Sequence, residues 1–271
     1  MIIGIAGKAG SGKDTVAGFI CNSFNGISIA QADPMKRFAE AVFGFSQEQL
    51  WGPSECRNAP DARFDNTKEW EESFKKFELV GLQWLKGIGA TEHNAIFTLE
   101  KWFAKLWHVY GPKETGDGTI APEQTLTPRI VLQLLGTEFG RSVDPNVWSN
   151  HAIQTAKKLL LGVHRYEKHK GLVADSKYPG PELVVISDVR FRNEVLNIKN
   201  GFGMVISVVD PNNASDSGPG VKDHQSEKEL NSIPSIWFDC IIQNNKWLGL
   251  EFLEEMVTSN LNWLIKPEFF G

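Results

Sequence analysis

Short apolar runs alternate with helix-length amphipathic patterns at the start of the chain. The first run, MIIGIA, leads through a glycine-rich loop into DTVAGFICNSF, where apolar residues recur at helical spacing at Val16, Phe19, Ile20 and Phe24. A second short run, ISIA, precedes the helical pattern ADPMKRFAEAVFGF. This alternation of strand and helix predicts an α/β fold.

The second predicted helix has a recognisable start. Asp33 suits the N-cap position and Pro34 suits the first turn. The apolar residues of this segment fall on one face: Met35, Phe38, Ala39 and Val42. We therefore expect a helix that begins at Asp33 and buries one side.

Residues 45–126 follow a different pattern, in which no strand of a core sheet is evident. Turn residues are frequent in WGPSECRNAPDARFDN. Two amphipathic stretches that predict helices follow it, KEWEESFKKF and IFTLEKWFAKLWHVY. A long polar connection is then predicted over GPKETGDGTIAPEQTLTP. The stretch TPRIVLQLLGTEFGR then predicts a helix capped by Thr127, and another helix follows Pro145.

The strand and helix alternation returns in the last third of the chain. ELVVISDVR is nearly continuously apolar, as strands buried in parallel sheets are, and a helix that ends near Gly201 follows it. GMVISVVD and DCIIQN predict two more strands, and a long helix from about Lys246 to Leu264 closes the chain. The intervening PNNASDSGPGVKDHQSEKEL is too long for an ordinary connection.

Composition narrows the class of protein. A chain of 271 residues can form one large α/β domain, or a core with an insertion. Its net charge of −5, with both signs interleaved, gives no broad positive face for nucleic acid. Its three cysteines, Cys21, Cys56 and Cys240, are scattered along the chain, which indicates reduced thiols. No stretch of the sequence is long and apolar enough to predict a membrane span. We expect a soluble cytoplasmic protein.

The segment GKAGSGKDT, residues 7–15, predicts a phosphate-binding loop. It matches the pattern GxxxxGK[ST] through Lys13, and it lies between a predicted strand and a predicted helix. Glycines let backbone N–H groups point inward, the helix N-terminus adds positive potential, and Lys13 would neutralise the outer phosphates. We therefore expect a bound di- or triphosphate.

Asp14 departs from the pattern, which has Ser or Thr at that place. A carboxylate cannot replace a hydroxyl ligand of Mg²⁺, so we assign the hydroxyl of Thr15 to a phosphate oxygen and expect the metal to be held by water and nucleotide. An alternative of equal weight is that Asp14 only stabilises the N-terminus of the helix.

A second group of candidate residues follows the strand LVVISDV. Asp188 lies where this strand ends, and ligands of open α/β sheets bind outside the carboxyl ends of strands. Arg190 and Arg192 could hold phosphate groups from the same loop. The alternative for these arginines is a surface position paired with Glu194.

Other nucleotide-binding classes fit less well. The chain has no NKxD guanine-reading motif and no DxxG switch motif, since NNKWLG lacks the Asp. These absences argue against a regulatory GTPase. The acidic balance and compact size argue against a motor or a DNA-dependent ATPase.

The motifs together resemble a known family. Five motifs occur along the chain in this order: GKAGSGKDT, ADPMKRFAEAVFG, TPRIVLQLLGTEFGRSVDPNVW, ISDVRFRNE and HQSEKEL. This combination resembles the deoxynucleoside monophosphate kinases of tailed bacteriophages over nearly the whole chain. The resemblance implies one P-loop NTPase domain over residues 1–271, with a five-stranded parallel sheet flanked by helices. It also implies a helical monophosphate-binding insertion over residues 45–150 and a lid over residues 211–230.

The resemblance also implies site residues. The donor phosphates would lie on Gly10, Ser11, Gly12, Lys13, Asp14 and Thr15. The acceptor would lie near Asp33, Lys36, Arg57, Arg129, Gln133, Thr137, Trp148, Asp188 and Arg190. Transfer of the phosphoryl group would depend on Lys13, Asp188, Arg190 and Arg192.

Each acceptor residue also has a structural alternative. Asp33 would serve only as a helix cap, and Lys36 and Arg57 only as solvated charges. Gln133 and Thr137 would be polar positions on a helix whose other face is buried. Without the resemblance, Trp148 fits a core position better than a base-stacking one.

The lid segment departs from small-nucleotide kinases, whose lids often carry arginines. Its basic residues are Lys222, His224 and Lys228. Transition-state charge would then be met by Lys13, Mg²⁺, Arg190, Arg192 or a lid lysine. Ser226 and Glu227 would either cap a helix or approach the nucleotide.

The resemblance predicts ATP-dependent phosphorylation of deoxynucleoside 5′-monophosphates for DNA precursor synthesis, with Mg²⁺, in the host cytoplasm if the protein is viral. The acceptor phosphate is already an oxyanion, so alignment and charge neutralisation would suffice without a strong base. One alternative is a kinase of another small phosphorylated metabolite, such as phosphomevalonate. Another is a nucleotide-binding switch without transfer activity. Two questions stay open: which bases the protein accepts, and whether it forms a homodimer.

Overall fold

The computed structural model describes residues 1–8, 10–92, 94–114, 120–211 and 229–265. The chain divides into two compact units. The sheet unit comprises Met1–Gln31, Ser149–Lys168 and Leu172–Gly271, and the helical unit comprises Ala32–Trp148 with His169–Gly171. The predicted single domain with an insertion at residues 45–150 stays a prediction.

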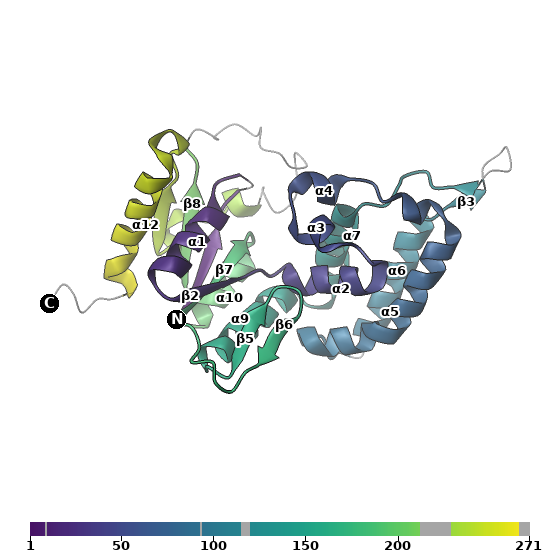
Figure 1. Ribbon diagram of the computed structural model, residues 1–271, viewed down its shortest axis with the longest axis horizontal. Coiled ribbons are helices and arrows are strands. Elements are labelled where there is room, and N and C mark those ends of the chain that lie inside the picture. The colour runs from purple at the N-terminus through teal and green to yellow at the C-terminus, as the bar shows by residue number, and fades with distance from the viewer. Residues whose placement is uncertain (9, 93, 115–119, 212–228, 266–271) are drawn as a thin grey trace. The chain divides into compact units, whose positions relative to one another are not determined.

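A five-stranded sheet forms the centre of the sheet unit (Figure 1). Its strands lie in the order β2-β7-β1-β8-β9. Each neighbouring pair is parallel, which confirms the predicted α/β fold with a five-stranded parallel sheet. The strands are β1 (Ile2–Ala6), β2 (Gly26–Ile29), β7 (Leu183–Val189), β8 (Met204–Val209) and β9 (Cys240–Gln243).

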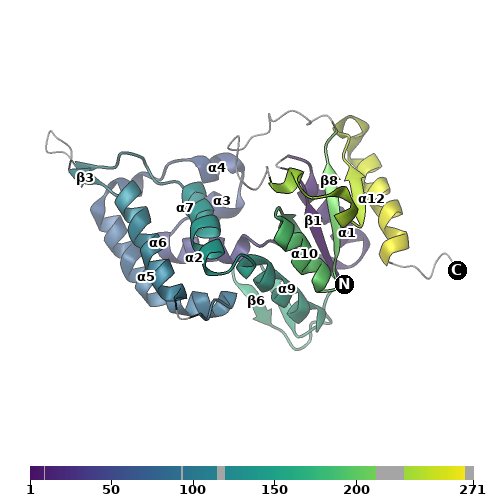
Figure 2. The same ribbon diagram turned by 180° about the vertical axis from the view of Figure 1, so that it is seen from behind.

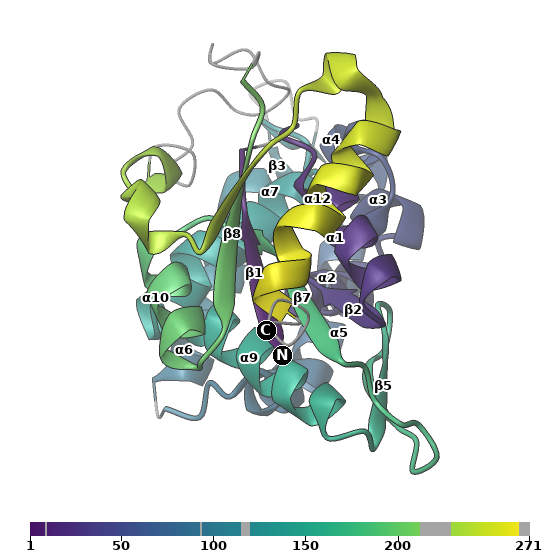
Figure 3. The same ribbon diagram turned by 90° about the vertical axis from the view of Figure 1, so that its left-hand side faces the viewer.

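Helices cover both faces of this sheet. On one face, α1 (Lys13–Ser23) and α12 (Gly249–Ile265) pack in a cluster with Ile3 and Ile5 (Figure 3). On the other, α9 (Val147–Leu160) and α10 (Arg192–Asn200) pack in a cluster with Ile2 (Figure 2). Successive residues of β1 thus face opposite layers, which explains why its pattern is apolar without alternation.

The helical unit is built around α2 (Asp33–Phe43), α5 (Thr67–Ile88) and α6 (Ala95–Tyr110). The amphipathic patterns predicted as helices in this region are confirmed by α5 and α6. Their buried faces are rich in aromatic rings: Phe38, Phe43, Phe64, Trp70, Phe77, Trp102 and Phe103. The ring of Phe103, for example, is tilted against that of Phe77 at 4.7 Å and stacked on that of Phe43 at 5.9 Å, and such contacts stabilise the core.

The predicted N-cap role of Asp33 is wrong. Ala32 occupies the N-cap position with helical dihedral angles of φ −74° and ψ −16°, so Asp33 is already the first residue of α2. The carboxylate of Asp33 accepts a hydrogen bond from Trp51 Nε1 at 3.0 Å instead. The helix ends at Gly44, whose positive φ of 62° suits glycine.

The predicted helix after Thr127 is divided into three parts. Thr127 Oγ1 accepts from the backbone N of Ile130 at 3.2 Å, which confirms the cap. The parts are α7 (Pro128–Leu134), a π-helical segment η2 (Leu135–Gly140) and α8 (Arg141–Val143). The pattern of apolar residues does not distinguish a π turn from an α turn, so the π-helical segment could not be predicted from it.

The remaining helices of this unit are short: α3 (Gln47–Trp51), α4 (Ser54–Asn58) and the 3-10 turn η1 (Ala62–Asp65). The predicted polar connection contains a small antiparallel pair, β3 (Lys113–Glu114) and β4 (Ile120–Ala121).

Other elements differ from the expected pattern. A two-stranded sheet of β5 (His164–Glu167) and β6 (Gly171–Ala174) was not predicted. Short 3-10 turns, η3 (Ser235–Trp237) and η4 (Lys246–Leu248), precede β9 and α12. Most of the predicted lid, including its candidate residues, lies outside the described residues: Lys222, His224, Ser226, Glu227 and Lys228.

None of the described helices is long and apolar enough to span a bilayer. The three cysteines are free thiols. Burial raises the pKa of the Cys21 thiol to about 11, so this thiol stays protonated at neutral pH, as a packing residue would.

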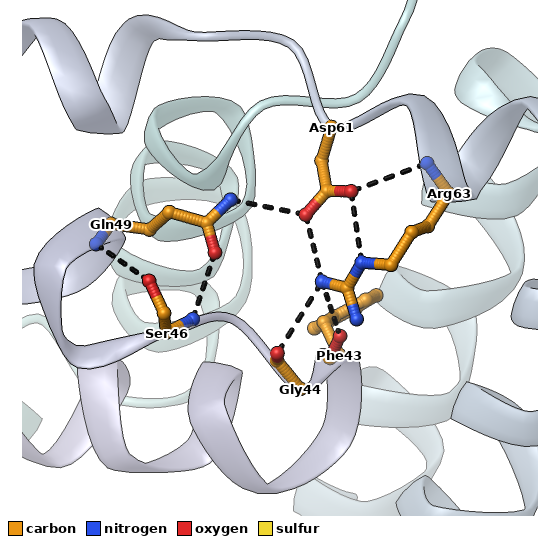
Figure 4. Close-up of polar contacts among 6 residues, drawn as sticks. All are labelled: Phe43, Gly44, Ser46, Gln49, Asp61 and Arg63. Atoms are coloured by element: carbon orange, nitrogen blue, oxygen red, sulfur yellow. Dashed lines mark hydrogen bonds and ion pairs between the residues drawn. The ribbon is translucent and has the colours of Figure 1, made fainter.

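An ion pair with several hydrogen bonds joins the start of η1 to the end of α2 in the helical unit (Figure 4). Asp61, which is 8% exposed, binds Arg63 through Nη2 at 2.7 Å and Nε at 3.0 Å. Gln49 Nε2 donates to the same carboxylate at 3.1 Å, and Arg63 also donates to the carbonyl oxygens of Phe43 and Gly44. Asp61 therefore holds three segments of the chain together.

The surroundings of Asp61 change its pKa in two opposite directions. Burial alone raises the pKa, but the hydrogen bonds from Arg63 and Gln49 and the charge of Arg63 outweigh burial and hold it below the ordinary value of 3.8. Because the folded-state pKa is lowered, the carboxylate stabilises the fold above pH 3.8, and this contribution is lost as the pH falls through the lowered value.

We predict that Asp61→Asn lowers the free energy of unfolding by about 1–2 kcal/mol at pH 7, because an amide N–H₂ would face the guanidinium and Arg63 is partly screened by water. In urea titrations of the full chain, the difference from the wild type should narrow below pH 3.8.

Glu72→Gln is the matched control, since Glu72 and Lys75 form an exposed pair in α5 at 3.0 Å. It should leave the stability unchanged. Equal stability of Asp61→Asn and the wild type at pH 7 would contradict the role given to Asp61.

Candidate phosphate-binding site

The loop between β1 and α1 is the predicted phosphate-binding loop. Gly10 and Gly12 have positive φ angles of 77° and 87°, in the left-handed region that residues with a Cβ avoid. α1 begins directly after Gly12, at Lys13, so the free N–H groups of its first turn face the loop. The predicted glycine positions are thus those that the backbone requires.

Asn244 fixes the loop from the end of β9. Its Nδ2 donates to the carbonyl oxygen of Ser11 at 2.8 Å, and its backbone N donates to the carbonyl oxygen of Val209 at 2.8 Å. A Cβ added to Gly12 would overlap this same Nδ2. Asn244 is 7% exposed, so the amide joins the loop to the sheet in a site largely closed to water.

Ser11 is the most enclosed polar residue of the loop. It is 2% exposed, and its Oγ has no hydrogen-bond partner among the described residues. A Cβ on Gly7 would contact this Oγ and lie 2.9 Å from the carbonyl oxygen of Val208. Gly7 therefore has no room for a side chain between Ser11 and the end of β8.

Lys13 and Asp14 interact with each other. Lys13 Nζ lies 3.0 Å from Asp14 Oδ1, with the Lys13 side chain 13% exposed and that of Asp14 79% exposed. Water screens a pair that is exposed on one side, so a phosphate would compete readily for Lys13. Asp14 also lies in the first turn of α1, where its negative charge interacts favourably with the positive end of the helix dipole.

Asp188 lies at the edge of the sheet where the loop begins. β7 pairs with β1, with Ala6 opposite Val189, so both strands end at the same edge. Asp188 Oδ1 accepts from the backbone N of Gln31, after β2, at 2.8 Å. This bond fixes the Asp188 carboxylate near the end of β7, the strand that lies next to β1.

The two arginines after β7 have different surroundings. The backbone N–H groups of Arg190 and Phe191 donate to Glu194 Oε2 at 2.8 and 3.1 Å, which closes a capping arrangement at the start of α10. Arg192 Nη2 donates to the carbonyl oxygen of Ser232 at 3.0 Å, and its guanidinium lies 5.2 Å from the Trp237 ring. The proposed phosphate contacts of Arg190 and Arg192 stay predictions.

Gln31 was not predicted as a site residue. It is 4% exposed, and neither Nε2 nor Oε1 has a partner in the described part of the chain. A buried amide without partners is costly, which makes Gln31 an additional candidate for the site at this edge of the sheet. Its signal in the sequence was a polar residue directly after the strand ISIA, and Asn244, the last residue of DCIIQN, follows β9 in the same way.

Two of the predicted acceptor residues of the helical unit gather around Trp51. Its Nε1 donates to Asp33, and Lys36 Nζ lies 5.6 Å from the centre of its ring. The ring of His169 meets Trp51 edge to face at 4.5 Å. Trp51 was not predicted, because only the folded chain brings it to α2.

Two other predicted acceptor residues are bound close to α4. Arg57 Nη1 donates to the carbonyl oxygen of Gly52 at 2.7 Å, and its Nη2 donates to Ser54 Oγ at 3.2 Å. Arg129 Nε donates to Asn58 Oδ1. These bonds orient both guanidinium groups.

The last three residues of the predicted acceptor set lie on or beside the π-helical segment. Thr137 Oγ1 donates to the carbonyl oxygen of Gln133 at 2.7 Å. Trp148 is 5% exposed, and its Nε1 donates to the carbonyl oxygen of Gly136 at 3.0 Å. These contacts agree with the structural alternatives for Thr137 and Trp148, and the acceptor roles stay predictions.

Two viral proteins are similar to this chain. A protein of Acanthamoeba polyphaga mimivirus that carries the name of a deoxynucleotide monophosphate kinase is 27% identical over 262 residues, which cover 95% of each chain. The deoxynucleoside-5′-monophosphate kinase of Escherichia phage T5 is 26% identical over 212 residues, which cover 72% of this chain and 70% of the phage protein. No protein-family model matches the chain.

This chain is related to the viral deoxynucleoside monophosphate kinases. The resemblance predicted from the motifs is therefore confirmed. The match to the mimivirus protein covers 95% of both chains. The similarity therefore extends over both the sheet unit and the helical unit of this chain.

The edge of the sheet in this kinase homologue suits magnesium chemistry in one respect. Carboxylate oxygens are the ligands that Mg²⁺ prefers, and Asp188 supplies them beside the phosphate-binding loop. Among the described residues, no group of three or more His, Cys, Asp or Glu side chains is placed to hold a metal. Magnesium held through nucleotide and water stays a prediction.

We predict that Gly12→Ala lowers the affinity for ATP at least tenfold, because the new Cβ would be strained at a φ of 87° and would displace Asn244. Titration calorimetry of the full chain would measure it.

Gly18→Ala is the matched control in α1, where an added Cβ has no neighbour within 4 Å. It should bind ATP as the wild type does and be equally or more stable. Wild-type affinity in Gly12→Ala would overturn the assignment of the loop.

Proposed function

We propose that this protein transfers the γ-phosphoryl group of ATP to the 5′-phosphate of a deoxynucleoside monophosphate. One observation supports it most. A loop with glycines in the left-handed conformation and Lys13 at the start of α1 lies beside Asp188, at one edge of a parallel sheet. The chain that carries it is related to viral kinases of this kind.

The phosphate-binding loop would bind the donor. The N–H groups around Gly10 and Gly12 and the N-terminus of α1 would receive the phosphate oxygens. Lys13 would leave Asp14 for the phosphates, because two negatively charged phosphates attract it more than one exposed carboxylate. The hydroxyl of Thr15 would contact a phosphate oxygen.

Asp188 and Arg190 would act at the transferred group. The acceptor phosphate is already an oxyanion, so it needs alignment and charge neutralisation more than a base. Mg²⁺ on the nucleotide would supply part of that neutralisation, and Asp188 would orient its water ligands. Arg190 would hold phosphate oxygens, and Arg192 would do so after leaving Ser232.

The helical unit would supply the acceptor residues. Its cationic side chains at Lys36, Arg57 and Arg129 suit a monophosphate, and the bonds that orient the two arginines reduce the entropy lost on binding. We assign the product to DNA precursor synthesis in the cytoplasm of the infected cell, because the two relatives are viral proteins.

We predict that the purified chain with ATP and Mg²⁺ forms a diphosphate from at least one deoxynucleoside monophosphate. A panel of deoxynucleoside monophosphates, phosphomevalonate and water as acceptors, read by ADP formation, would measure it. Turnover with phosphomevalonate alone would favour the other small-metabolite kinase. ATP binding without acceptor-dependent ADP would favour a nucleotide-binding switch.

We predict that Lys13→Ala reduces turnover at least a hundredfold and leaves the fold intact, since Lys13 acts on phosphate charge and its exposed partner contributes little to stability. Lys75→Ala, which removes an exposed lysine of α5, is the control and should be fully active. Near-normal turnover in Lys13→Ala would be incompatible with the proposed donor site.

A further inference from the structure

The dipeptide Asn-Gly occurs twice in the sequence, as Asn25 with Gly26 and as Asn200 with Gly201. This dipeptide is prone to deamidation, because a glycine without a Cβ leaves its backbone nitrogen unhindered beside the asparagine side chain. The reaction requires an asparagine side chain that can turn and a glycine N–H that is not held in a hydrogen bond. The two dipeptides differ in these requirements.

The first dipeptide lies in the turn between α1 and β2. Asn25 is exposed. Its backbone carbonyl oxygen accepts from the backbone N of Glu182 at 3.0 Å, and its side-chain amide has no partner among the described residues. Gly26 begins β2, which lies at the edge of the sheet, and an edge strand leaves part of its N–H groups unpaired. The Asn25 amide is therefore able to approach the backbone nitrogen of Gly26.

The fold itself favours this pair of residues in the turn. Asn25 has a φ of 47°, in the left-handed region that asparagine adopts more readily than most residues with a Cβ. A Cβ on Gly26 would lie 2.4 Å from Leu183 Cδ1 and 3.1 Å from the Cα of Cys21. Closing the turn and packing it against β7 thus select an asparagine followed by a glycine, which is also the reactive sequence.

The second dipeptide is held by a helix. Asn200 is the last residue of α10, and the backbone N of Gly201 donates to the carbonyl oxygens of Asn197 and Ile198, both at 3.1 Å. This nitrogen must leave both bonds before it can react, so the end of the helix has to open first. Asn200 is exposed like Asn25, so the backbone and not the exposure distinguishes the two sites.

We propose that Asn25 is a site of spontaneous deamidation, which yields isoaspartate and aspartate at this position. The backbone nitrogen of Gly26 attacks Cγ of Asn25 and loses its proton, and the side-chain nitrogen leaves as ammonia. Water then opens the resulting succinimide ring at either carbonyl carbon. One water is consumed and one ammonia is released, without oxidation or reduction.

The two products would affect the sheet differently. Isoaspartate lengthens the backbone by one carbon directly before the first pair of β2 with β7, in which Gly26 lies opposite Leu183. Aspartate keeps the backbone and adds only a negative charge near Glu182. Both Asn25 and Glu182 are exposed, so water and salt screen that charge. The isoaspartate form is therefore the one that weakens the pairing of β2.

Peptide mapping by mass spectrometry tests the proposal on the full chain incubated in mildly alkaline buffer. Fragment ions assign the conversion of amide to carboxyl to single asparagines, including Asn22 and Asn25. Asn25 should react at least about tenfold faster than Asn200, because only the second site needs the helix to open. In urea, where both dipeptides are unfolded, the two rates should become similar.

Methylation by a protein isoaspartate methyltransferase with a labelled methyl donor counts the isoaspartate directly. Asn25→Gly keeps the left-handed turn without the amide, and it should remove most of the label that the aged wild type accepts. Asn200→Gln is the matched control and should accept as much label as the wild type.

Three results would overturn the proposal. The first is deamidation of folded Asn200 at a rate equal to or above that of Asn25. The second is undiminished labelling of aged Asn25→Gly. The third is a difference between the two sites that persists in urea, since the neighbouring residues and not the fold would then cause it.

Discussion

Parallel pairing of β1 with β7 on one side and β8 on the other is the constraint on which the site depends. In this register the three strands end at one edge, so the loop after β1, the Asp188 carboxylate near the end of β7 and the residues after β8 all lie at that edge. Asn244, after β9, completes the arrangement by bonding to Ser11. A shift of β1 by one residue would move Ile3 and Ile5 to the opposite layer, so burial of the strand also fixes the position of the loop.

The helical unit is stabilised in another way. Many of its buried side chains are aromatic rings from α2, α5 and α6. The ion pair of Asp61 with Arg63 joins the start of η1 to the end of α2. Large rings bury much apolar surface per residue. This suits the helical unit, because the pairing of β3 with β4 in its described residues involves only two residues of each strand. The same packing fixes α2, and therefore the positions of Asp33 and Lys36.

The sequence predicted what depends on local pattern. The strands of the sheet, α1, α5, α6 and the glycines of the loop each have a pattern within about twenty residues. Residues that depend on distant contacts were missed. Asn244 bonds to a residue 233 positions away, and Gln31 and Trp51 gain their meaning only from the elements beside them. Asp33 was misplaced by one position, because the backbone of Ala32 is already helical.

The central claim is that the γ-phosphoryl group moves from ATP to a nucleotide acceptor. The most direct measurement follows the label of γ-³²P-ATP in the presence of the full chain, Mg²⁺ and a deoxynucleoside monophosphate. We predict that the label appears as the β-phosphate of the deoxynucleoside diphosphate, and that it does not appear there with Lys13→Ala. Release of the label only as inorganic phosphate, at a rate independent of the acceptor, would contradict the account.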